Sequence, residues 1–510
     1  MESMSTLTRR TLLVGGLALT ALGAGSARLV DPFTLGVASG DPTPDGVVLW
    51  TRLAPVPLAE DGMGGMPSRP VEVKWELAED ERFRRVVRRG TEWARPELGH
   101  SVHVDVAGLE SGHEYFYRFA TDGHLSRTGR TRTAPSPWTL TTPLTMAFAS
   151  CAQYEHGYFT AYRRLAEDEP DLVLHLGDYQ YEYEAGVHVA PNGNVRGVDG
   201  PRTTTLANYR QRYAQYKSDA DLQAAHAVAP WSVVWDDHEV DDNWAGMVYS
   251  KPEKPQPDFP RRRTAAFQAY YENMPIRQAP HGLDLQLYRR IRWGRLATFH
   301  MLDTRQYRDD QPCGDGIKVC DERLEPQRTI LGPEQESWLL GGFRDSVARW
   351  DVLGNQVFFS QYDHTRGPVQ ETNLDAWDGY AADRDRVVAG FSSVRNAVVL
   401  TGDVHAAWGV DIKERWDDPS SRTVGTELAG TSITSGGDGS EDYPETPEWF
   451  AENPHIKYFN NRRGYVRTHL TADGFRADFR GLDHVSRPGA EVSTKASFLI
   501  EDRVPGLNPL

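Results

Sequence analysis

The sequence contains little cysteine, no excess of positive charge and, beyond its N-terminus, no long hydrophobic run. Only three of its 510 residues are cysteines, which excludes a disulfide-rich scaffold. Lysine and arginine number 56 against 72 aspartates and glutamates, and the net charge of -16 predicts no nucleic-acid-binding surface. Without an apolar stretch of about 20 residues past the N-terminus, we expect no transmembrane span in the mature chain.

The N-terminus carries the features of an export signal. Arg9 and Arg10 precede an uncharged run at 14–25 that is rich in leucine, alanine and glycine. A twin arginine ahead of a short, mildly apolar stretch is typical of substrates of the Tat export machinery. A buried helix or a membrane anchor is the alternative, but the run is short and glycine-rich for a membrane span. We therefore predict a Tat signal peptide over residues 1–27 and a secreted, extracellular or cell-wall-associated protein.

The three cysteines divide into a pair and a single residue. Cys313 and Cys320 lie seven residues apart in a glycine-containing segment that can fold back, so we expect a disulfide between them. Cys151 is then a free thiol. A lone cysteine is most often a small buried apolar residue. Cys151 follows an apolar, strand-like run that ends at Ser150, however, and this position favours a functional role.

Two kinds of pattern divide the chain, whose length favours two domains. From residue 33 to 134, short strand-like runs are separated by Gly, Pro and Asp, which predicts a β-sandwich; the lack of a cysteine pair there favours a fibronectin-like one. Residues 134–143 are rich in proline and form the predicted boundary. From 144 to 510, strands alternate with helical patterns, which predicts a second domain with helices covering a sheet.

The second domain has recognisable elements. Helices are predicted over 159–168, 262–272 and 333–344. Strands are predicted at the following runs: 146–150, 171–176, 231–235, 296–302, 357–360, 396–400 and 465–470.

Polar clusters follow three of these apolar runs. They read Gly-Asp-Tyr-Gln-Tyr at 177–181, Asp-Asp-His-Glu at 236–239 and Gly-Asp-Val-His at 402–405. Because strand ends converge at a rigid sheet edge, carboxylates, imidazoles and a phenol placed there are what a metal site needs. Asp237 is the better hard-metal ligand of its cluster, and His238 is a candidate general acid. We therefore predict metal-assisted hydrolysis.

Each cluster has a simpler explanation when taken alone. A Gly-Asp turn, a solvated acidic loop or a structural histidine is common in proteins. Asp403 and His405 lie two residues apart on an extended segment, however, and so project to the same side. Thiolate, imidazole and phenolate suit a transition metal such as iron, whereas oxygen-only positions suit calcium. Arg305 and the arginines at 261–263 are candidates for gripping phosphate oxygens, although solvated surface positions are the more common explanation.

The ordered series of motifs resembles the PhoD-like alkaline phosphatase and phospholipase D family of the metallophosphoesterase superfamily. It comprises the N-terminal signal, the start of the sandwich at 38–52, Ala-Ser-Cys at 149–151, the three clusters, and Leu-Asp-Thr-Arg-Gln-Tyr at 302–307. The resemblance covers essentially the whole chain. It implies a mixed α+β or α/β fold, in which a fibronectin-like β-sandwich precedes a metallophosphoesterase-like β-sandwich core with flanking helices.

The resemblance also implies cofactors and residue roles. Cys151 and Asp403 stand where the wider superfamily has an Asp-x-His and a Gly-His motif, and both departures match the PhoD-like branch. His238 would be the catalytic partner of the leaving group or of a phosphoryl oxygen. Fe³⁺ would be held by Cys151, Asp178, Tyr181 and His405, with Ca²⁺ near Asp178, Asp237 and Asp403.

The implied activity is hydrolysis of phosphate monoesters or diesters by a metal-bound hydroxide or oxide. The expected partners are phosphate-ester small molecules or a phospholipid. Phospholipase D activity on choline phospholipids is an alternative enzymatic activity. A calcium-dependent secreted binding protein is an alternative of another class, in which the acidic loops are structural and Cys151, Tyr181 and His405 have no function.

Overall fold

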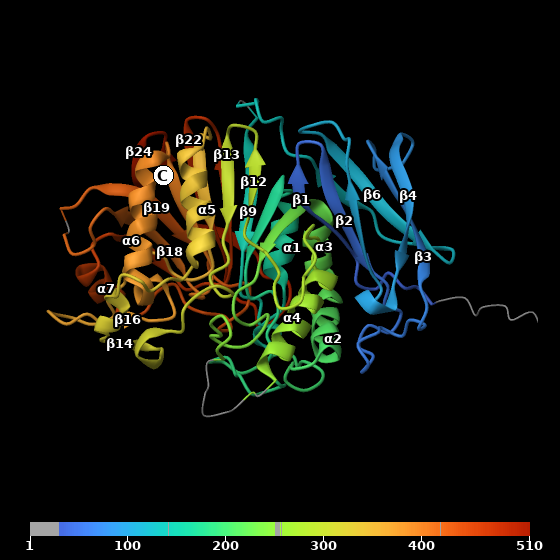
Figure 1. The fold of residues 1–510 in the computed structure, drawn as a ribbon, viewed down its shortest axis with the longest axis horizontal. Coiled ribbons are helices and arrows are strands. Elements are labelled where there is room, and N and C mark those ends of the chain that lie inside the picture. The colour runs from blue at the N-terminus through green and yellow to red at the C-terminus, as the bar shows by residue number, and fades with distance from the viewer. Residues whose placement is uncertain (1–29, 141, 250–255, 257, 419) are drawn as a thin grey trace, which may run out of the picture.

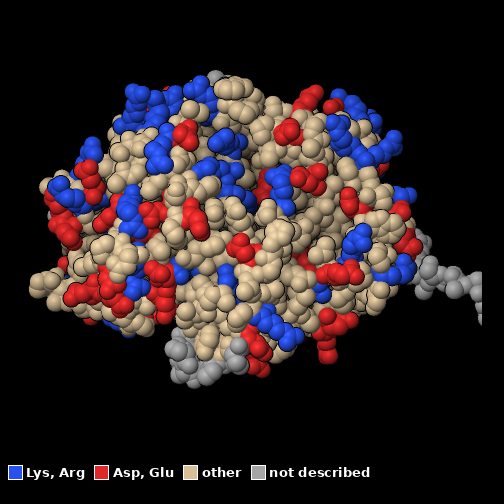
Figure 2. Space-filling model, viewed as in Figure 1, with Lys and Arg blue, Asp and Glu red and all other residues tan. Residues whose placement is uncertain are grey.

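The computed structural model describes residues 30–510 except 141, 250–255, 257 and 419 (Figure 1). The predicted signal peptide at 1–27 lies outside these residues. The fold is mixed α/β, with large β-sheets and few helices. In the described part of the chain, every helix is too short or too polar to cross a bilayer. On the face shown in Figure 2, acidic and basic side chains are both spread over the surface.

The largest sheet has ten strands and contains the strands that lead into two of the polar clusters. Its spatial order is β24 (Val504–Pro509), β23 (Val492–Glu501), β22 (Gly474–Leu482), β21 (Gly464–Leu470), β9 (Leu144–Ala149), β10 (Leu172–Leu176), β11 (Pro230–Val234), β1 (Val37–Thr43), β2 (Gly46–Arg52) and β5 (Ser101–Val106). The strands β9, β10, β11 and β1 are parallel neighbours, and the remaining pairings are antiparallel.

A second sheet of seven strands leads into the third cluster. Its order is β12 (Arg289–Trp293), β13 (Ala297–Met301), β15 (Trp350–Gly354), β17 (Ala397–Thr401), β19 (Thr423–Ala429), β18 (Ala407–Lys413) and β20 (Ile456–Asn460). A short ribbon pairs β14 (Ile317–Lys318) with β16 (Thr372–Asn373).

The N-terminal strands form a sandwich whose first layer is part of the largest sheet. The second layer has the order β4 (Val86–Ala94), β3 (Val71–Ala78), β6 (Glu114–Thr121) and β7 (His124–Leu125), and β8 (Gly129–Arg132) also pairs with β6. Alternating residues of both layers, such as Val47, Leu49, Val73 and Tyr117, form one buried cluster. Because β1 pairs with β11, the sandwich and the rest of the chain share a continuous sheet.

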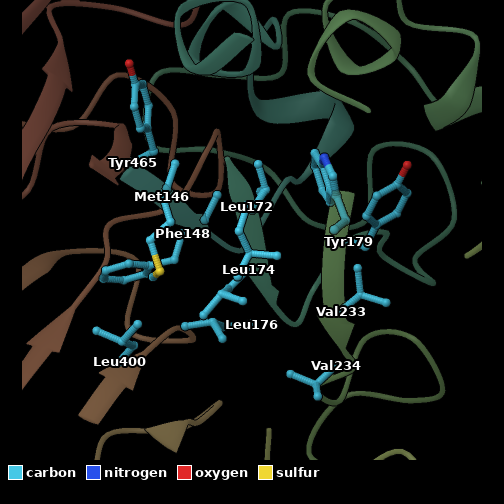
Figure 3. Close-up of a cluster of buried hydrophobic side chains, with 14 of the residues drawn as sticks. Met146, Phe148, Leu172, Leu174, Leu176, Tyr179, Val233, Val234, Leu400 and Tyr465 are labelled. Carbon is cyan, nitrogen blue, oxygen red and sulfur yellow. The ribbon is translucent and has the colours of Figure 1, made fainter. Parts of the chain in front are cut away.

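A hydrophobic core fills the space between the two large sheets. Met146 and Phe148 of β9 and Leu174 of β10 lie in the same buried cluster as Leu400 of β17 (Figure 3). The parallel strands are buried on both faces, which explains why they appear in the sequence as continuous apolar runs. This core fixes the strand ends from which the polar clusters emerge.

Helices cover the outer faces of the sheets, and most begin at a recognisable signal. The Asp219 carboxylate accepts hydrogen bonds from the first amides of α3, and Pro333 occupies the first turn of α5. The helices are α1 (Thr160–Glu167), α2 (Leu206–Lys217), α3 (Ala220–Val228), α4 (Phe259–Asn273), α5 (Pro333–Arg344), α6 (Ala381–Gly390) and α7 (Thr446–Glu452).

The predicted strand at 357–360 is wrong. The strand in this region is β15, and residues 357–360 form a buried loop after it. The amides of Phe359 and Ser360 donate to the two carboxylate oxygens of Glu427, each at 2.9 Å. A buried side chain therefore supplies the acceptors that a neighbouring strand would have offered. The other predicted strands and helices are present, with bounds that differ by a few residues at most.

Candidate metal centre

The predicted ligands emerge from the ends of four parallel strands in two sheets. Cys151 follows β9, Asp178 follows β10, Asp237 follows β11 and Asp403 follows β17. The two sheets are joined at this edge, because the amide of Ile433 donates to the Ser150 carbonyl at 3.0 Å. Residues that lie up to about 250 positions apart in the sequence therefore meet at one edge, as strand-end geometry requires.

The structure brings all six predicted metal ligands and His238 together. In each of three groups, the potential ligand atoms lie within 4.8 Å of one another. Asp178 belongs to two of the groups and Asp237 to two, so these carboxylates are placed to bridge neighbouring cations. The three groups are Cys151–Asp178–His405, Asp178–Asp237–His238 and Asp236–Asp237–Asp403.

Tyr181 completes the first group. Its hydroxyl donates to Asp178 Oδ2 at 2.9 Å and lies 3.2 Å from His405 Nε2. Ser435 Oγ donates to the same hydroxyl at 2.7 Å, which holds the phenol in place. The phenol, the thiol, the imidazole and the carboxylate thus converge on one point, a donor set that suits a transition metal.

The backbone at the predicted ligands is strained. Cys151, Asp178, Asp403 and His405 have φ of 61°, 54°, 61° and 53°, in the left-handed region that non-glycine residues rarely adopt. Each such residue costs on the order of 1–3 kcal/mol and persists only where the surroundings impose it. Gly177 permits the turn before Asp178: its φ is 111°, and a Cβ there would lie 2.4 Å from Asp236 Cβ. These left-handed residues let the chain turn directly after the strands.

Buried charges of one sign dominate the electrostatics. Burial raises the pKa of Asp403 well above its ordinary value, and the nearby Asp236 carboxylate raises it further. Burial also raises the pKa of Asp178, against the opposing effect of His238. Burial and then Asp178 raise the pKa of the Cys151 thiol. Cations placed among these groups would stabilise their deprotonated forms.

Two buried oxygen atoms test whether cations fit here. Asp178 Oδ1 and Asp236 Oδ2 are buried and have no hydrogen-bond partner among the described residues. A buried carboxylate oxygen without a partner is destabilising unless a cation or a proton satisfies it. Both residues belong to potential ligand groups that also contain other carboxylates. The residues present therefore fit metal ions.

His238 is held beside the centre by a carboxylate that the sequence analysis did not identify. Its Nδ1 lies 2.8 Å from Glu182 Oε2, and its Nε2 lies 3.8 Å from Asp237 Oδ2. Burial alone would lower the pKa of His238, but Asp237, Asp178 and Glu182 raise it well above its ordinary value. In turn, burial would raise the pKa of Glu182, but His238 and two arginines lower it to about 2. The Nε2 atom therefore lies on the side of the ring that faces the Asp237 carboxylate.

Arg262, Arg263 and Arg305 are not solvated surface residues, so that expectation is wrong for them, whereas Arg261 is exposed as expected. Arg305 is fully buried, donates to Asp236 Oδ1 at 2.5 Å and holds both oxygens of Asp375 at 2.7 and 2.8 Å. Arg262 and Arg263 are also buried, and Arg262 lies 2.8 Å from Asp241. Each donates to protein acceptors, although Arg262 Nη2 and Arg263 Nε are buried without a partner among the described residues. Arg305 thus positions Asp236, and each of its three guanidinium nitrogens donates to a carboxylate.

Sequence reasoning missed several residues of the site. Asp236 belongs to the same potential ligand group as Asp237. Position in the motif alone had favoured Asp237 over Asp236 as the metal ligand. Glu182 directly follows Tyr181, so its place in the cluster was a usable signal. Ser435 and Arg463 had no such signal. Arg463 donates to the carbonyls of Ser435 and His405 at 2.6 and 2.5 Å, and so links the loops that carry them.

A cavity of about 960 Å³ opens next to the centre. Asp403 and His405 belong to its lining. A cavity of this size suits a small organic molecule.

Comparisons with known proteins define the class. A profile of the family described as PhoD-like phosphatase matches residues 146–479, and a second profile, PhoD-like phosphatase, N-terminal domain, matches residues 20–135. Alkaline phosphatase D of Bacillus subtilis (strain 168) is 51% identical over 483 residues, which cover 93% of this chain and 82% of that protein. The chain is therefore an enzyme that hydrolyses phosphoric esters.

The structural comparison agrees with the sequence comparison. A solved structure described as that of PhoD matches with a TM-score of 0.91 at 51% identity, and the match covers 94% of this chain and 92% of that one. The chain belongs to the PhoD-like phosphatase family. The same match accounts for the mixed α/β fold with its large sheets.

The pairing predicted for the three cysteines is confirmed. The disulfide between Cys313 and Cys320 is present and Cys151 is a free thiol, both as predicted, and the structure shows that Cys151 is buried. The family makes small phosphate esters the expected substrates and removes the support for a purely adhesive, calcium-dependent binding protein.

Proposed function

We propose that this phosphoric ester hydrolase works through a mixed Fe³⁺ and Ca²⁺ centre at the strand ends. Cys151, Asp178, Tyr181 and His405 would hold the iron, and Asp178, Asp237 and Asp403 would hold calcium. The observation that carries the proposal is the convergence of a thiol, a phenol and an imidazole on Asp178, beside a separate group of carboxylates. Soft and nitrogen donors suit iron, whereas oxygen donors alone suit calcium.

The residues then have distinct roles in hydrolysis. Metal ions, when bound, supply positive charge for the phosphoryl oxygens and lower the pKa of water at the site. His238 is the catalytic residue proposed to donate its Nε2 proton to the leaving oxygen or to a phosphoryl oxygen. Glu182 orients that imidazole through Nδ1 and stabilises its protonated form. Ser435 holds Tyr181, and Arg305 holds Asp236.

The domain boundaries, the fold of each domain and the signal peptide are also part of the proposal. We assign residues 33–134 to a fibronectin-like N-terminal domain and residues 144–510 to a metallophosphoesterase-like catalytic domain. The sandwich of β1 to β8 and the helix-covered pair of large sheets support this assignment. Residues 1–27 would direct the folded protein to the Tat machinery and so to the cell exterior or the cell wall, as the twin arginine indicates.

Monoesters and diesters are both proposed as substrates, because the centre itself acts on phosphorus and not on what is attached to it. Phospholipase D activity on choline phospholipids is the alternative. Hydrolysis of a phosphate monoester, a diester and a choline phospholipid by the purified enzyme, with and without a chelator, distinguishes these activities.

The metal assignment is tested with Asp178→Ala and Cys151→Ala. Because Asp178 belongs to two ligand groups, Asp178→Ala should lower turnover at least about 100-fold and reduce both bound metals. Cys151→Ala should lose iron and the visible absorption of a tyrosinate–iron charge transfer, while calcium remains. Elemental analysis and absorption spectra of the purified proteins measure both effects.

The exposed carboxylate of Asp473 provides the matched control, because Asp473→Ala changes a surface charge without touching the centre. It should keep full activity, metal content and colour. Wild-type turnover in Asp178→Ala, or full colour in Cys151→Ala, would contradict the assignment.

A further inference from the structure

We propose that the cavity beside the metal centre is a leaving-group subsite for a flat, uncharged ring attached to the phosphate ester. The inference rests on the proposed function of the centre, because the ester phosphorus must lie there for the ring to enter the cavity. Asp403 and His405 contribute both to the potential ligand groups and to the cavity lining, so the two spaces are continuous.

Aromatic rings form one wall of the cavity. They come from the loop after β15, from β18 and β20, and from the segment that contains α7. Trp408 and Phe459 have ring centroids 4.5 Å apart, and Trp449 lies 5.4 Å from Phe459 and 5.9 Å from Trp408. The rings are Phe358, Tyr362, Trp408, Tyr443, Trp449 and Phe459.

The aromatic wall is fixed in position but not closed off. Phe358, Trp408 and Phe459 are only 4%, 6% and 7% exposed, whereas Tyr443 at the edge is 41% exposed. Stacked aromatic side chains offer a rigid apolar surface on which a flat ring can lie in offset or edge-on contact. Aliphatic groups would also bury area there, but only a ring adds the aromatic contact.

The charges in the lining disfavour a second anion. Arg463 is the one lysine or arginine among the described lining residues, and its terminal nitrogens donate to protein acceptors that include the His405 carbonyl and Asn461. The Asp378 carboxylate is held by Arg384 and by the Tyr362 amide. A carboxylate or second phosphate on the leaving group would therefore find no unpaired lysine or arginine among the described lining residues.

The polar atom of the central ring is turned away from the cavity. The Trp408 indole N–H is buried, out of reach of a ligand, and has no hydrogen-bond partner among the described residues. Trp408 therefore offers the ligand an apolar ring surface, which matches an uncharged ring better than an anionic group.

Competitive inhibition by non-hydrolysable phosphonates tests the subsite. Inorganic phosphate, methylphosphonate, phenylphosphonate and 4-carboxyphenylphosphonate are compared as inhibitors of the metal-loaded enzyme. Burial of the phenyl ring should make phenylphosphonate bind about tenfold or more tightly than methylphosphonate. The added carboxylate of 4-carboxyphenylphosphonate should remove most of that advantage.

Substitutions locate the effect in the aromatic wall. Trp449→Ala and Tyr443→Ala should each reduce the preference for phenylphosphonate over methylphosphonate and leave inhibition by phosphate within about twofold of wild type. Tyr443 lies at the exposed edge, so its replacement reports on the subsite even where Trp449→Ala fails to fold. Trp93 is an exposed tryptophan on β4, distant in the sequence from Tyr443 and Trp449. Trp93→Ala is therefore the matched control and should keep the full preference.

Each outcome is decisive. Equal binding of phenylphosphonate and methylphosphonate by the wild-type enzyme would overturn the subsite, as would an unchanged preference in both aromatic variants. Failure of inorganic phosphate to inhibit would instead overturn the proposed centre. Tighter binding of the carboxylated ring would show that the cavity accepts anions and contradict the charge argument.

Discussion

At the scale of single residues, the site depends on side chains that hold other side chains. Four of the predicted ligands have positive φ, and neighbouring side chains hold the Tyr181 hydroxyl, the His238 imidazole and the Asp236 carboxylate. Glu182 is the clearest example, because its carboxylate lies 2.8 Å from His238 Nδ1 and sets the direction of the imidazole. Backbone strain such as the positive φ of the four ligands is concentrated at functional sites.

Glu182→Gln should separate positioning from metal binding. Glutamine has nearly the same shape and can still accept from Nδ1, but it has no charge, so the protonated imidazole of His238 loses its negatively charged partner. We expect kcat to fall about 10- to 100-fold with KM and metal content nearly unchanged. Steady-state kinetics and elemental analysis provide the measurement. The exposed neighbour Glu184→Gln is the control, and a parallel loss of metal in Glu182→Gln would indicate a structural role instead.

Lys217→Met tests a buried charge far from the mechanism. Lys217 is 2% exposed, and its ammonium faces the rings of Trp50 and Tyr179 with no carboxylate partner among the described residues. Burial, with the added effect of Arg52, lowers its pKa well below the ordinary value. The folded state therefore disfavours the proton. The unfolded chain, in contrast, keeps this proton up to its pKa of about 10.4. The unfolding free energy of the wild-type protein should therefore rise with pH until about 10.4.

The substitution should therefore stabilise the protein most at neutral pH. We expect a gain in unfolding free energy on the order of 1–3 kcal/mol near pH 7 that shrinks as the pH approaches 10. Thermal unfolding of both proteins between pH 7 and 10 measures the difference. The exposed Lys457→Met should show no such trend. A gain that stays constant with pH would mean that packing, and not charge, accounts for it.

At the scale of elements, the sequence predicted the parts whose signal is local. Buried parallel strands such as β10 and β11 appear as continuous apolar runs, and Pro333 marks the start of α5, so their bounds were nearly correct. The run at 357–360 was misassigned because burial alone does not distinguish a strand from a loop whose amides are satisfied by Glu427. Strand pairing partners depend on distant segments and were not predictable.

The same distinction applies to the site. Cys151, Asp178 and Asp403 follow apolar strands, and this local signal was enough to predict that they meet. Arg463 and Ser435, together with the aromatic wall of the cavity, contribute through contacts between loops that lie far apart in the sequence. No pattern around those residues indicates the contacts. The metal ligands and their chemistry were therefore predictable from the sequence, whereas the residues that hold them in place were not.

At the scale of the whole molecule, the N-terminal sandwich is built into the catalytic part. β1 covers the edge of β11 as a parallel neighbour, and Trp50 Nε1 donates to the Glu272 carbonyl at 3.0 Å. Arg52 is fully buried and donates to the Arg210 carbonyl and to Asn273 Oδ1, each at 3.1 Å. The proline-rich connection at 134–143 therefore separates two sequence regions that share one sheet.

Removal of residues 33–134 should accordingly prevent folding of residues 144–510. The deletion would expose the edge of β11 and leave the acceptors of Trp50 and Arg52 without their buried donors, and an exposed, flat, apolar edge promotes aggregation. Size-exclusion chromatography and circular dichroism of the 144–510 fragment measure the outcome, with the chain from residue 30 onward as the folded control. A monomeric, active fragment would show that the two regions fold independently and that the shared strand pairing contributes little to stability.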